Sequence, residues 1–549
     1  MRTVHKHFLA GWLVVLVVLI LTVGWLGLKY RYPEQVLTST DLNLNTTSTE
    51  EIGSIDDFSS ALTVQEDGTI NVQEKIAYNH QVPISFLERR LLSTLNDQGG
   101  KYLFPIKDIV VTDEAGRPIT FTKTATENGW LLKFQNEGVW PIGRQVINLN
   151  YNLARVINFY EDHDELLWPV TGAGFTWPVE RIGVLAKLPT QDSTQELTAS
   201  CLVNKTISDC LISNLMASQV GYSLLRELPK GESLMIKLSW PKGVLTNPAF
   251  SARFFFVLND NPWLLLPVIV LLIMFCLWFF HGRDLTARFI KRSENDTIPP
   301  LSPALTGTLA DEKFDLRDLT GEFFSLAVRG IVAFKKGEGG WQIVLRQNDN
   351  NLSSWDKLLL LNAFADAKEI SFGQLRLNLS DSIHALKSEL YQFLVIKEYF
   401  PESPKKVRNF YTTIAILFLL TGIFMVWLGS GVLNSGSFIL TAVIVFWLGQ
   451  YMPYKTIKGS AVYSQILIYR AYLNSLATTK NIINDWSKHL PYVAIFGFSN
   501  TLVDRLTMGV NNWPVWLIMN KPFDSKTFSN TLLEINNSLR AKLSGIFGR

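Results

Sequence analysis

The stretch "WLLLPVIVLLIMFCLWFF", from Trp263 to Phe280, divides this chain into two parts of different character. It contains no Asp, Glu, Lys, Arg or His, and its length is close to the roughly 20 residues that a helix needs to cross a bilayer. Before it, apolar and polar residues alternate in many short runs, whereas most runs after it have helical spacing. The stretch therefore predicts a transmembrane helix, at residues 263–281, between a β-rich domain and a helical one.

Three further apolar stretches are long enough to cross a bilayer. Residues 8–28 exceed the apolar core of a cleavable signal peptide, usually about 7–15 residues, so residues 1–28 are expected to form an uncleaved signal anchor. Cleavage of this segment is the alternative. Residues 410–428 and 432–451 are joined by an uncharged linker and predict a helical hairpin. None of the four spans contains Asp, Glu, Lys, Arg or His, which favours membrane anchors over a proton or ion pathway.

Lysine and arginine near the ends of the spans predict the orientation of the chain, because such residues are retained on the cytoplasmic side. They follow the second span, precede the third and follow the fourth: Arg283, Arg288, Lys291, Arg292, Lys405, Lys406, Arg408, Lys455 and Lys458. Residues 29–262 are therefore expected outside the cytoplasm. Residues 282–409 and 453–549 are expected inside it.

The outer region, residues 50–250, has the pattern of a β-sandwich. In "SALTVQEDGTINVQEKIAY" apolar and polar residues alternate on both sides of Asp67-Gly68, which is a hairpin signal. The same pattern recurs around Gly116 and around Asn128-Gly129. Several such strands, separated by turn residues, predict an extracytoplasmic β-sandwich.

Two of the three cysteines, Cys201 and Cys210, lie close together in this outer region. Outside the cytoplasm two nearby cysteines are more often a disulfide than a metal site, so we expect them to be bonded. Two free thiols are the alternative. Cys276 lies within the second span, where a thiol is a small apolar group.

The segment "YEDHDELLWP", Tyr160 to Pro169, concentrates oxygen and nitrogen ligands. Asp162, His163, Asp164 and Glu165 could together hold a cation. However, a calcium loop needs regularly spaced ligands and a turn glycine, and a zinc site needs partners from elsewhere in the chain. A solvated loop that leads into a buried strand is the interpretation that we favour.

The segment "TIPPLSPALTG" follows the basic residues after the second span. Its prolines favour extended polyproline geometry, so residues 282–310 are expected to form a basic juxtamembrane segment and a semi-rigid spacer. The spacer residues are Pro299, Pro300, Pro303 and Gly307. An ordinary proline linker that nothing recognises is the default interpretation.

Residues 311–400 predict a winged-helix-like module. Asp315 is positioned as the N-cap of a helix that Gly330 ends, and two strands flank the turn "KKGEGG". Residues 282–409, which include the module, carry nearly as many acidic as basic residues, and the cations are scattered, which favours protein interaction over nucleic-acid binding. Residues 453–549 have helical spacing and are expected to form a cytoplasmic helical domain. Three polar residues of this domain are expected in a surface turn: Asp485, Lys488 and His489.

Several motifs occur in a definite order: "IDDFSSALTVQEDGTINVQEKIAY", "ELLWPVTGAGFTWPVERI", "GRD", "PPLSPALTG", "LVIKEYF" and "HLPYVAIFG". Because its motifs occur in this order, the chain resembles the bacterial YciQ-like family of membrane proteins, which share a domain of unknown function. The resemblance covers nearly the whole chain. The resemblance implies a bacterial cell-membrane protein with the topology above, and it supplies no activity. Two segments depart from the family pattern: "ISFLERRLLSTL" replaces a "GxxRxIP"-like stretch, and the glycine-rich tail is replaced by "LSGIFGR".

The motifs of common enzyme classes are missing from the sequence. S-x-x-K patterns at Ser354 and Ser403 lack their companion motifs, so we expect no enzyme activity and no cofactor or metal. The sequence thus predicts a multi-domain α+β membrane protein that acts as a scaffold or signal relay, with an outer binding domain and an inner protein-interaction module. The expected partners are the lipid bilayer and other membrane or envelope proteins; no nucleic acid is expected, and homo-oligomerisation is left open. A component of a transport or export system is the alternative.

Overall fold

A computed structural model describes residues 53–547 except 98–99, 173, 190–196, 205, 208–209, 217, 281–297, 347–351, 429–430, 479–484 and 498. The predicted signal anchor and most of the predicted basic juxtamembrane segment lie outside the described residues. The chain divides into two compact units: residues 1–269 with 418–441, and residues 270–417 with 442–549. The first contains a sheet-rich domain and the second a helical domain.

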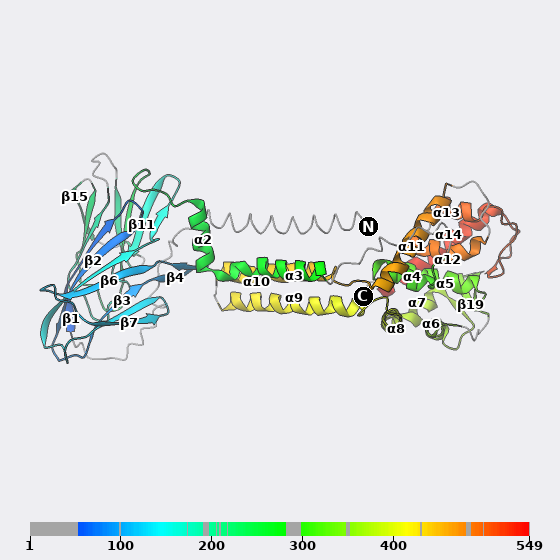
Figure 1. The fold of residues 1–549 in the computed structure, drawn as a ribbon, viewed down its shortest axis with the longest axis horizontal. Coiled ribbons are helices and arrows are strands. Elements are labelled where there is room, and N and C mark those ends of the chain that lie inside the picture. The colour runs from blue at the N-terminus through cyan, green and yellow to red at the C-terminus, as the bar shows by residue number, and fades with distance from the viewer. Residues whose placement is uncertain are drawn as a thin grey trace. The chain divides into compact units, whose positions relative to one another are not determined.

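The sheet-rich domain consists of strands β1 to β17 (Figure 1). In chain order they are β1 (Gly53–Val64), β2 (Ile70–His80), β3 (Leu87–Leu92), β4 (Thr94–Asp97), β5 (Gly100–Leu103), β6 (Ile106–Asp113), β7 (Phe121–Thr126), β8 (Gly129–Phe134), β9 (Gly143–Leu153), β10 (Ile157–Phe159), β11 (His163–Pro169), β12 (Ile182–Lys187), β13 (Thr198–Val203), β14 (Thr206–Ile207), β15 (Cys210–Met216), β16 (Gln219–Leu224) and β17 (Leu234–Pro241). The described strands form a seven-stranded sheet in the order β15-β16-β12-β1-β2-β9-β6 and a five-stranded sheet in the order β10-β11-β17-β13-β14. β3, β8 and β7 form a smaller sheet, and β4 pairs with β5.

β1 and β2 form the central hairpin, as the alternating pattern predicted. They pair antiparallel up to Val64 and Ile70, and the turn between them places Gly68 at a φ of 80°. Glycine adopts this left-handed conformation at little cost. Asp67 Oδ1 closes the turn by accepting a hydrogen bond from the Thr69 amide at 2.9 Å. One face of the hairpin is buried and the other is exposed.

The buried faces of the sheets share one apolar core. Phe58 of β1 lies in it with Trp168 of β11 and Ile236 of β17, so the two larger sheets contribute to the same interior. The prediction of a large β-rich N-terminal region is therefore confirmed. The parallel pairing of β1 with β12 and the separate sheet of β3, β8 and β7 were not predicted.

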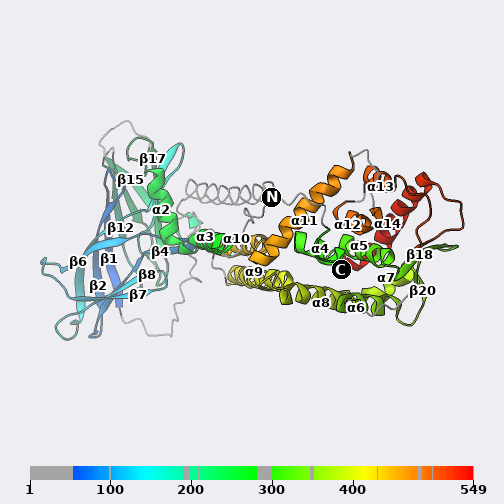
Figure 2. The same ribbon diagram turned by 45° about the vertical axis from the view of Figure 1, so that its right-hand side comes forward.

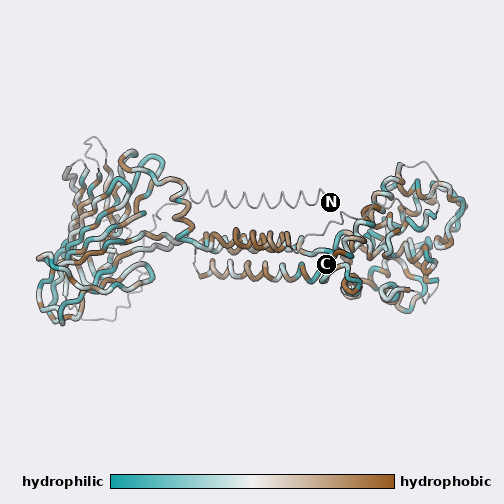
Figure 3. Tube along the Cα trace, in the orientation of Figure 1, coloured by the Kyte–Doolittle hydropathy of each residue, from teal (hydrophilic) through white to brown (hydrophobic). Residues whose placement is uncertain are grey.

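Among the described residues, three helices are long and apolar enough to cross a membrane. They are the segment Pro262–Phe280, which comprises the short 3₁₀ helix η1 (Pro262–Leu265) and α3 (Leu266–Phe280), and helices α9 (Pro404–Trp427) and α10 (Val432–Gly449). Figure 3 shows apolar residues along these helices. They correspond to the second, third and fourth predicted spans.

Helices α9 and α10 approach each other closely at two glycines. A Cβ atom on Gly422 would lie 2.8 Å from Ile439 Cγ1 and 3.1 Å from the Ser435 carbonyl oxygen, and a Cβ atom on Gly449 would clash with Tyr411. Such small residues let two membrane helices pack backbone to backbone. The pair therefore forms the hairpin that the sequence predicted.

The helical domain contains nine of the described helices and a four-stranded sheet (Figure 2). The helices are α4 (Pro303–Asp311), α5 (Leu316–Val328), α6 (Ser354–Phe364), α7 (Phe372–Ser380), α8 (Ile383–Ile396), α11 (Ile457–Leu476), α12 (Trp486–Phe496), α13 (Asn500–Leu506) and α14 (Ser525–Phe547). The strands are β18 (Val332–Gly337), β19 (Gly340–Leu345), β20 (Glu369–Ser371) and β21 (Leu517–Ile518), in the order β20-β19-β18-β21.

The segments 311–400 and 453–549 were treated as separate domains in the sequence, and the structure corrects this. They share one apolar core, in which Phe323 of α5 and Leu375 of α7 lie with Leu532 of α14. Each segment therefore buries part of its apolar surface against the other.

The predicted helix and hairpin of residues 311–400 both form. Asp315 caps α5 in a capping box with Asp318, and Gly330 follows the helix at a φ of 79°. β18 and β19 then pair antiparallel. Both edges of this hairpin are occupied, however, by β20 on one side and by β21 of the C-terminal segment on the other, so the hairpin is part of a larger sheet.

The predicted polyproline spacer is wrong at Pro303 and Gly307. Pro303 is the first residue of α4, a position that suits proline because its missing N–H would have no helical partner. Gly307 lies inside α4 against the side chain of Asp318, and Leu301 is buried in the core of the helical domain. Pro299 and Pro300 precede the helix without regular structure, so this segment begins the folded domain.

Helix α5 crosses α12 at Gly321, where a Cβ atom would meet Ile495 Cγ2 at 2.6 Å and the Pro491 carbonyl oxygen at 2.9 Å. We expect Gly321→Ala to destabilise the helical domain by about 1–3 kcal/mol because the helices must separate. Hydrogen exchange of α5 and α12 in the detergent-solubilised full chain measures this. Gly339→Ala, at a position with nothing within 4 Å of an added Cβ, is the control and should change stability by less than about 0.5 kcal/mol. Equal exchange in the two variants would contradict the expectation.

Candidate functional site

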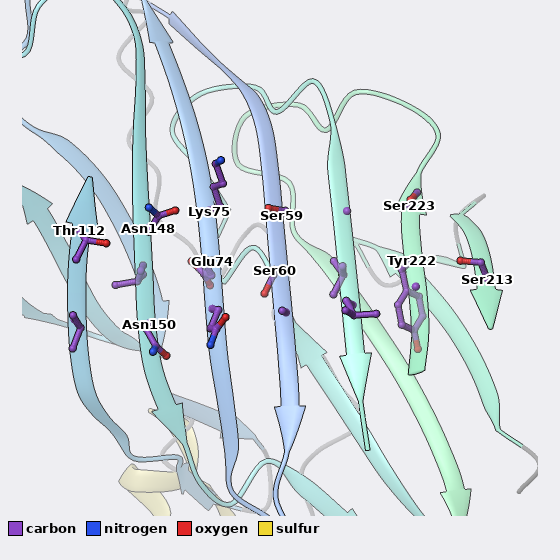
Figure 4. A pocket seen from close by; sticks show the side chains of 18 residues that line it. Ser59, Ser60, Glu74, Lys75, Thr112, Asn148, Asn150, Ser213, Tyr222 and Ser223 are labelled. Carbon is purple, nitrogen blue, oxygen red and sulfur yellow. The ribbon is translucent and has the colours of Figure 1, made fainter. Parts of the chain in front are cut away.

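The exposed face of the seven-stranded sheet contains a hollow of about 740 Å³, which we call the sheet trough. Its lining comes from all seven strands of the sheet. The residues that line it include Ser59, Ala61, Gln73, Lys75, Thr112, Asn148, Asn150, Gly183, Leu185, Gly221 and Ser223. Figure 4 labels six polar members of this set: Ser59, Lys75, Thr112, Asn148, Asn150 and Ser223.

Small residues form the centre of the sheet trough. Ser59 of β1 lies beside Gly183 of β12, and Ala61 of β1 lies beside Leu185, which in turn pairs with Gly221 of β16. A Cβ atom on Gly183 would have no atom within 4 Å, so the space above this strand is open. The hollow exists because glycine, alanine and serine alternate here with buried apolar residues.

Amide side chains border the sheet trough on β2 and β9, and hydrogen bonds hold them in place. Asn71 Nδ2 donates to Asn150 Oδ1 at 2.9 Å and to Asn152 Oδ1 at 3.0 Å. Asn148 Nδ2 donates to the carbonyl oxygen of Asp113 at 2.8 Å. The asparagine side chains at this border are therefore held in fixed positions.

The charged side chains near the sheet trough, two cations and one carboxylate, lie close to one another. Lys75 lies 3.6 Å from Glu114, and Arg144 lies 3.8 Å from the same carboxylate. All three side chains are well exposed, so solvent screens these interactions. A lining with this composition favours an uncharged ligand that makes hydrogen bonds.

Directly beneath the sheet trough, Arg89 is buried in a network that the sequence analysis missed. Its guanidinium donates to both carboxylate oxygens of Glu74, at 2.8 and 2.7 Å, and to the carbonyl oxygens of Val170 and Thr171. The Tyr151 hydroxyl donates to Glu74 at 2.8 Å. Although burial disfavours the charge, attraction to Glu74 raises the pKa of Arg89.

We expect Arg89→Met to destabilise the sheet-rich domain by about 3–5 kcal/mol, because Glu74 would remain buried without its partner. Urea unfolding of the solubilised full chain, with hydrogen exchange of β2 and β3, measures the loss. Arg90→Met is the matched control: that side chain is a third exposed and lies 3.6 Å from Glu88, so its loss should cost less than about 1 kcal/mol. Similar losses in both variants would show that the buried pair has no special role.

A disulfide joins Cys201 of β13 to Cys210 of β15, with the two Cα atoms 6.3 Å apart. β13 belongs to the five-stranded sheet and β15 is the edge strand of the seven-stranded sheet. The bond therefore connects the two sheets near one end of the sheet trough. The cysteines are a structural link and do not line the hollow.

The carboxylates of "YEDHDELLWP" do not converge. Asp164 and Glu165 are both buried, and because they are neighbours on β11 they point to opposite faces. Asp164 pairs with Lys242, and Glu165 pairs with Lys237 at 2.8 Å. Within the described part of the chain, no group of three or more His, Cys, Asp and Glu side chains could hold a metal ion.

The helical domain contains buried acidic side chains that sequence reasoning also missed. Glu322 is fully buried, and its Oε2 accepts a hydrogen bond from the Ala304 amide at the start of α4, at 2.9 Å. Burial, with a contribution from the negative charge of Asp356, raises the pKa of Glu322 to about 7. Burial also raises the pKa of Asp318 well above its ordinary value. Asp356 accepts from Arg329 at 2.9 Å.

The polar cluster of α12 divides into an exposed and a buried part. Asp485 and Lys488 are exposed and pair at 2.9 Å, as a surface turn predicts. His489 is buried instead, and its Nδ1 lies 2.7 Å from the Tyr469 hydroxyl. The prediction of a surface turn is therefore wrong for His489.

We expect the helical domain to lose stability as the pH rises from about 5 to 8. The folded-state pKa of Glu322 lies above its ordinary value of 4.5, so its stabilising effect is complete below that value and is lost as the pH passes about 7. Asp318 acts in the same direction. Thermal unfolding of the solubilised chain at several pH values measures this. Glu322→Gln should reduce the dependence, whereas Glu338→Gln, at an exposed position, should leave it intact. An unchanged dependence in Glu322→Gln would contradict the assignment.

Two family models match most of the chain. The N-terminal domain of a family described as predicted membrane protein (DUF2207) matches residues 54–240, and the C-terminal domain of the same family matches residues 293–506. No curated protein is similar to the chain at a significant level.

Similarity to solved structures is weak. An M1 zinc metallopeptidase from Deinococcus radiodurans has 11% sequence identity and a TM-score of 0.22, over 34% of this chain and 42% of its own. An aminopeptidase N family protein from Idiomarina loihiensis has 8% identity and a TM-score of 0.21, over 33% of this chain and 29% of its own. The chain thus spans less than half the length of these relatives, and TM-scores this low carry no argument.

Proposed function

We propose that this chain, which belongs to the DUF2207 family of predicted membrane proteins, is a membrane-anchored, non-enzymatic recognition protein. In this proposal the sheet trough binds an extended, uncharged chain rich in hydroxyl and amide groups. The helical domain then either relays a signal of ligand binding to other proteins or acts as a scaffold that holds them at the membrane.

The observation that carries the proposal is the open hollow across the seven-stranded sheet. Its centre of small residues gives a polymer room to lie across the strands, and Gln73, Asn148 and Asn150 offer hydrogen bonds along its path. Glu74 and Lys75 are adjacent on β2 and point to opposite faces, so they do not form an acid–base pair in the hollow. This arrangement suits recognition better than catalysis.

The proposed sidedness places the sheet-rich domain outside the cytoplasm. The basic residues near the ends of the membrane helices support it, and so does the disulfide, because disulfides persist in oxidising compartments. The helical domain then lies inside, where its winged-helix-like helix and hairpin would serve protein interaction.

The membrane helices support an anchoring role over transport. The hydroxyl groups of Ser435, Ser437 and Thr441 in α10 each donate to a backbone carbonyl oxygen four residues earlier, in α10 or at Gly431 just before it. They are thus satisfied by the backbone of this segment and do not offer a polar path to a solute.

We expect Gly183→Trp to fill the sheet trough without disturbing the fold, because the space beyond this glycine is open. The assay measures binding of the full chain in nanodiscs to oligomers of N-acetylhexosamine, which present hydroxyl and acetamide groups on an uncharged chain. Affinity should fall at least tenfold. Lys187→Trp, on the same strand and the same exposed face but outside the hollow, is the control and should bind as the original chain does. Equal binding by both variants, or no binding by the original chain, would reject this ligand class.

A further inference from the structure

Helix α2 (Phe250–Asp260) lies between the sheet-rich domain and the membrane segment Pro262–Phe280. Its sequence, "FSARFFFVLND", exposes aromatic side chains: Phe250 is 50% exposed and Phe255 is 65% exposed. The ring of Phe254 lies 6.3 Å from that of Phe250 and 5.9 Å from that of Phe255. These three residues form a continuous surface, which we call the phenylalanine face.

The opposite side of α2 is fixed to the sheet-rich domain through a buried carboxylate. Asp260 pairs with the guanidinium of Arg155 and also accepts a hydrogen bond from the Leu103 amide at 3.2 Å. The same guanidinium lies 4.2 Å from the ring centre of Phe256. The orientation of α2, and with it the direction of the phenylalanine face, is therefore set by the domain.

The phenylalanine face carries no charge. The one cation of α2, Arg253, is turned away and donates to the Pro248 carbonyl oxygen at 3.1 Å, with its guanidinium near the ring of Phe159. An exposed cluster of aromatic side chains without interspersed charge is unfavourable in water and marks a contact surface.

The position of α2 in the chain identifies what covers this face. Only Asn261 separates α2 from the membrane segment, and Trp263 at the start of that segment is 48% exposed, as tryptophans at the bilayer interface commonly are. α2 also runs across the direction of residues 418–427 of α9 and 432–441 of α10, which belong to the same unit (Figure 1). A helix that runs across the membrane helices at their end lies along the bilayer surface.

We propose that α2 is an interfacial helix whose phenylalanine face enters the boundary between lipid headgroups and acyl chains on the side of the sheet-rich domain. Short helices with one aromatic or aliphatic face bind bilayers in this way. Because Asp260 fixes α2 to the domain, contact with lipid also fixes the orientation of the domain, and with it the sheet trough, relative to the membrane surface. This inference depends on membrane insertion of the chain and does not depend on the ligand of the sheet trough.

Spin labels in the full chain, reconstituted into phosphatidylcholine nanodiscs, test the proposal. Cys276→Ser removes the free thiol that the structure describes, and Phe255→Cys carries the nitroxide; Phe250→Cys repeats the measurement at a second position. Collision rates with oxygen, which partitions into lipid, and with a polar nickel chelate report the surroundings of each label. Ile269→Cys in α3 provides the lipid reference, and Leu225→Cys, which is 68% exposed in the sheet-rich domain, provides the water reference.

The labels at Phe255 and Phe250 should resemble the lipid reference, with oxygen collisions at least severalfold more frequent than nickel collisions. A nickel collision rate equal to that at Leu225 would show that the face is in water and would overturn the proposal. Low rates with both reagents would show that protein covers the face, from a second copy or from another segment of this chain, and would overturn it equally.

Discussion

The ion pair between Arg89 and Glu74 is the interaction on which the sheet-rich domain most depends. A buried guanidinium must have its donors satisfied, and here two carboxylate oxygens and the carbonyl oxygens of Val170 and Thr171 accept from it. The pair thereby connects β3, β2 and the segment that follows β11. Its position also determines the face above, because the neighbours of Glu74 on β2 point outward and line the sheet trough. The strand register of β2 therefore has two consequences. It places the charge of Glu74 in the interior, and it places the polar neighbours of Glu74 in the lining of the sheet trough.

The sequence predicted the local features of this domain and missed those that depend on distant contacts. Alternation and turn residues identify β1 and β2 because both signals lie within a few positions of each other. Residue type does not distinguish Arg89 from Arg90, and the sequence analysis treated "ISFLERRLLSTL" only as a departure from a family pattern. One signal was present: Leu87 and Leu91 lie two positions on either side of Arg89, so a strand with these leucines inward also places Arg89 inward. The open space at Gly183 leaves no comparable trace, because only the assembled sheet brings this glycine between Ser59 and Ser223.

The helical domain shows the same division. The capping residue and apolar spacing of α5 are local, and they were predicted, whereas Pro303 was misread because a proline suits both a polyproline segment and the first turn of a helix. Asp318 and Glu322 lie four positions apart, beside the apolar residues Leu319 and Phe323, which places them on the buried side of α5. The spacing of these two acidic residues along the helix could therefore have predicted that both are buried. What it could not supply is the partner of Glu322, the free amide at the start of α4, because that contact depends on how two helices pack.

Each domain is joined to its own membrane helices through a carboxylate that binds arginine. Asp260 holds Arg155 where the sheet-rich domain meets the membrane segment. At the end of α4, Glu312 accepts from Lys455 at 2.7 Å and from Arg408 at 3.2 Å, so it holds residues next to α10 and within α9. From the sequence, Arg408 and Lys455 served only to predict the orientation of the chain. In the structure both form ion pairs with Glu312. Two of the cations that predict the orientation of the chain therefore also attach the folded helical domain to the helical hairpin, and both are largely buried in this contact.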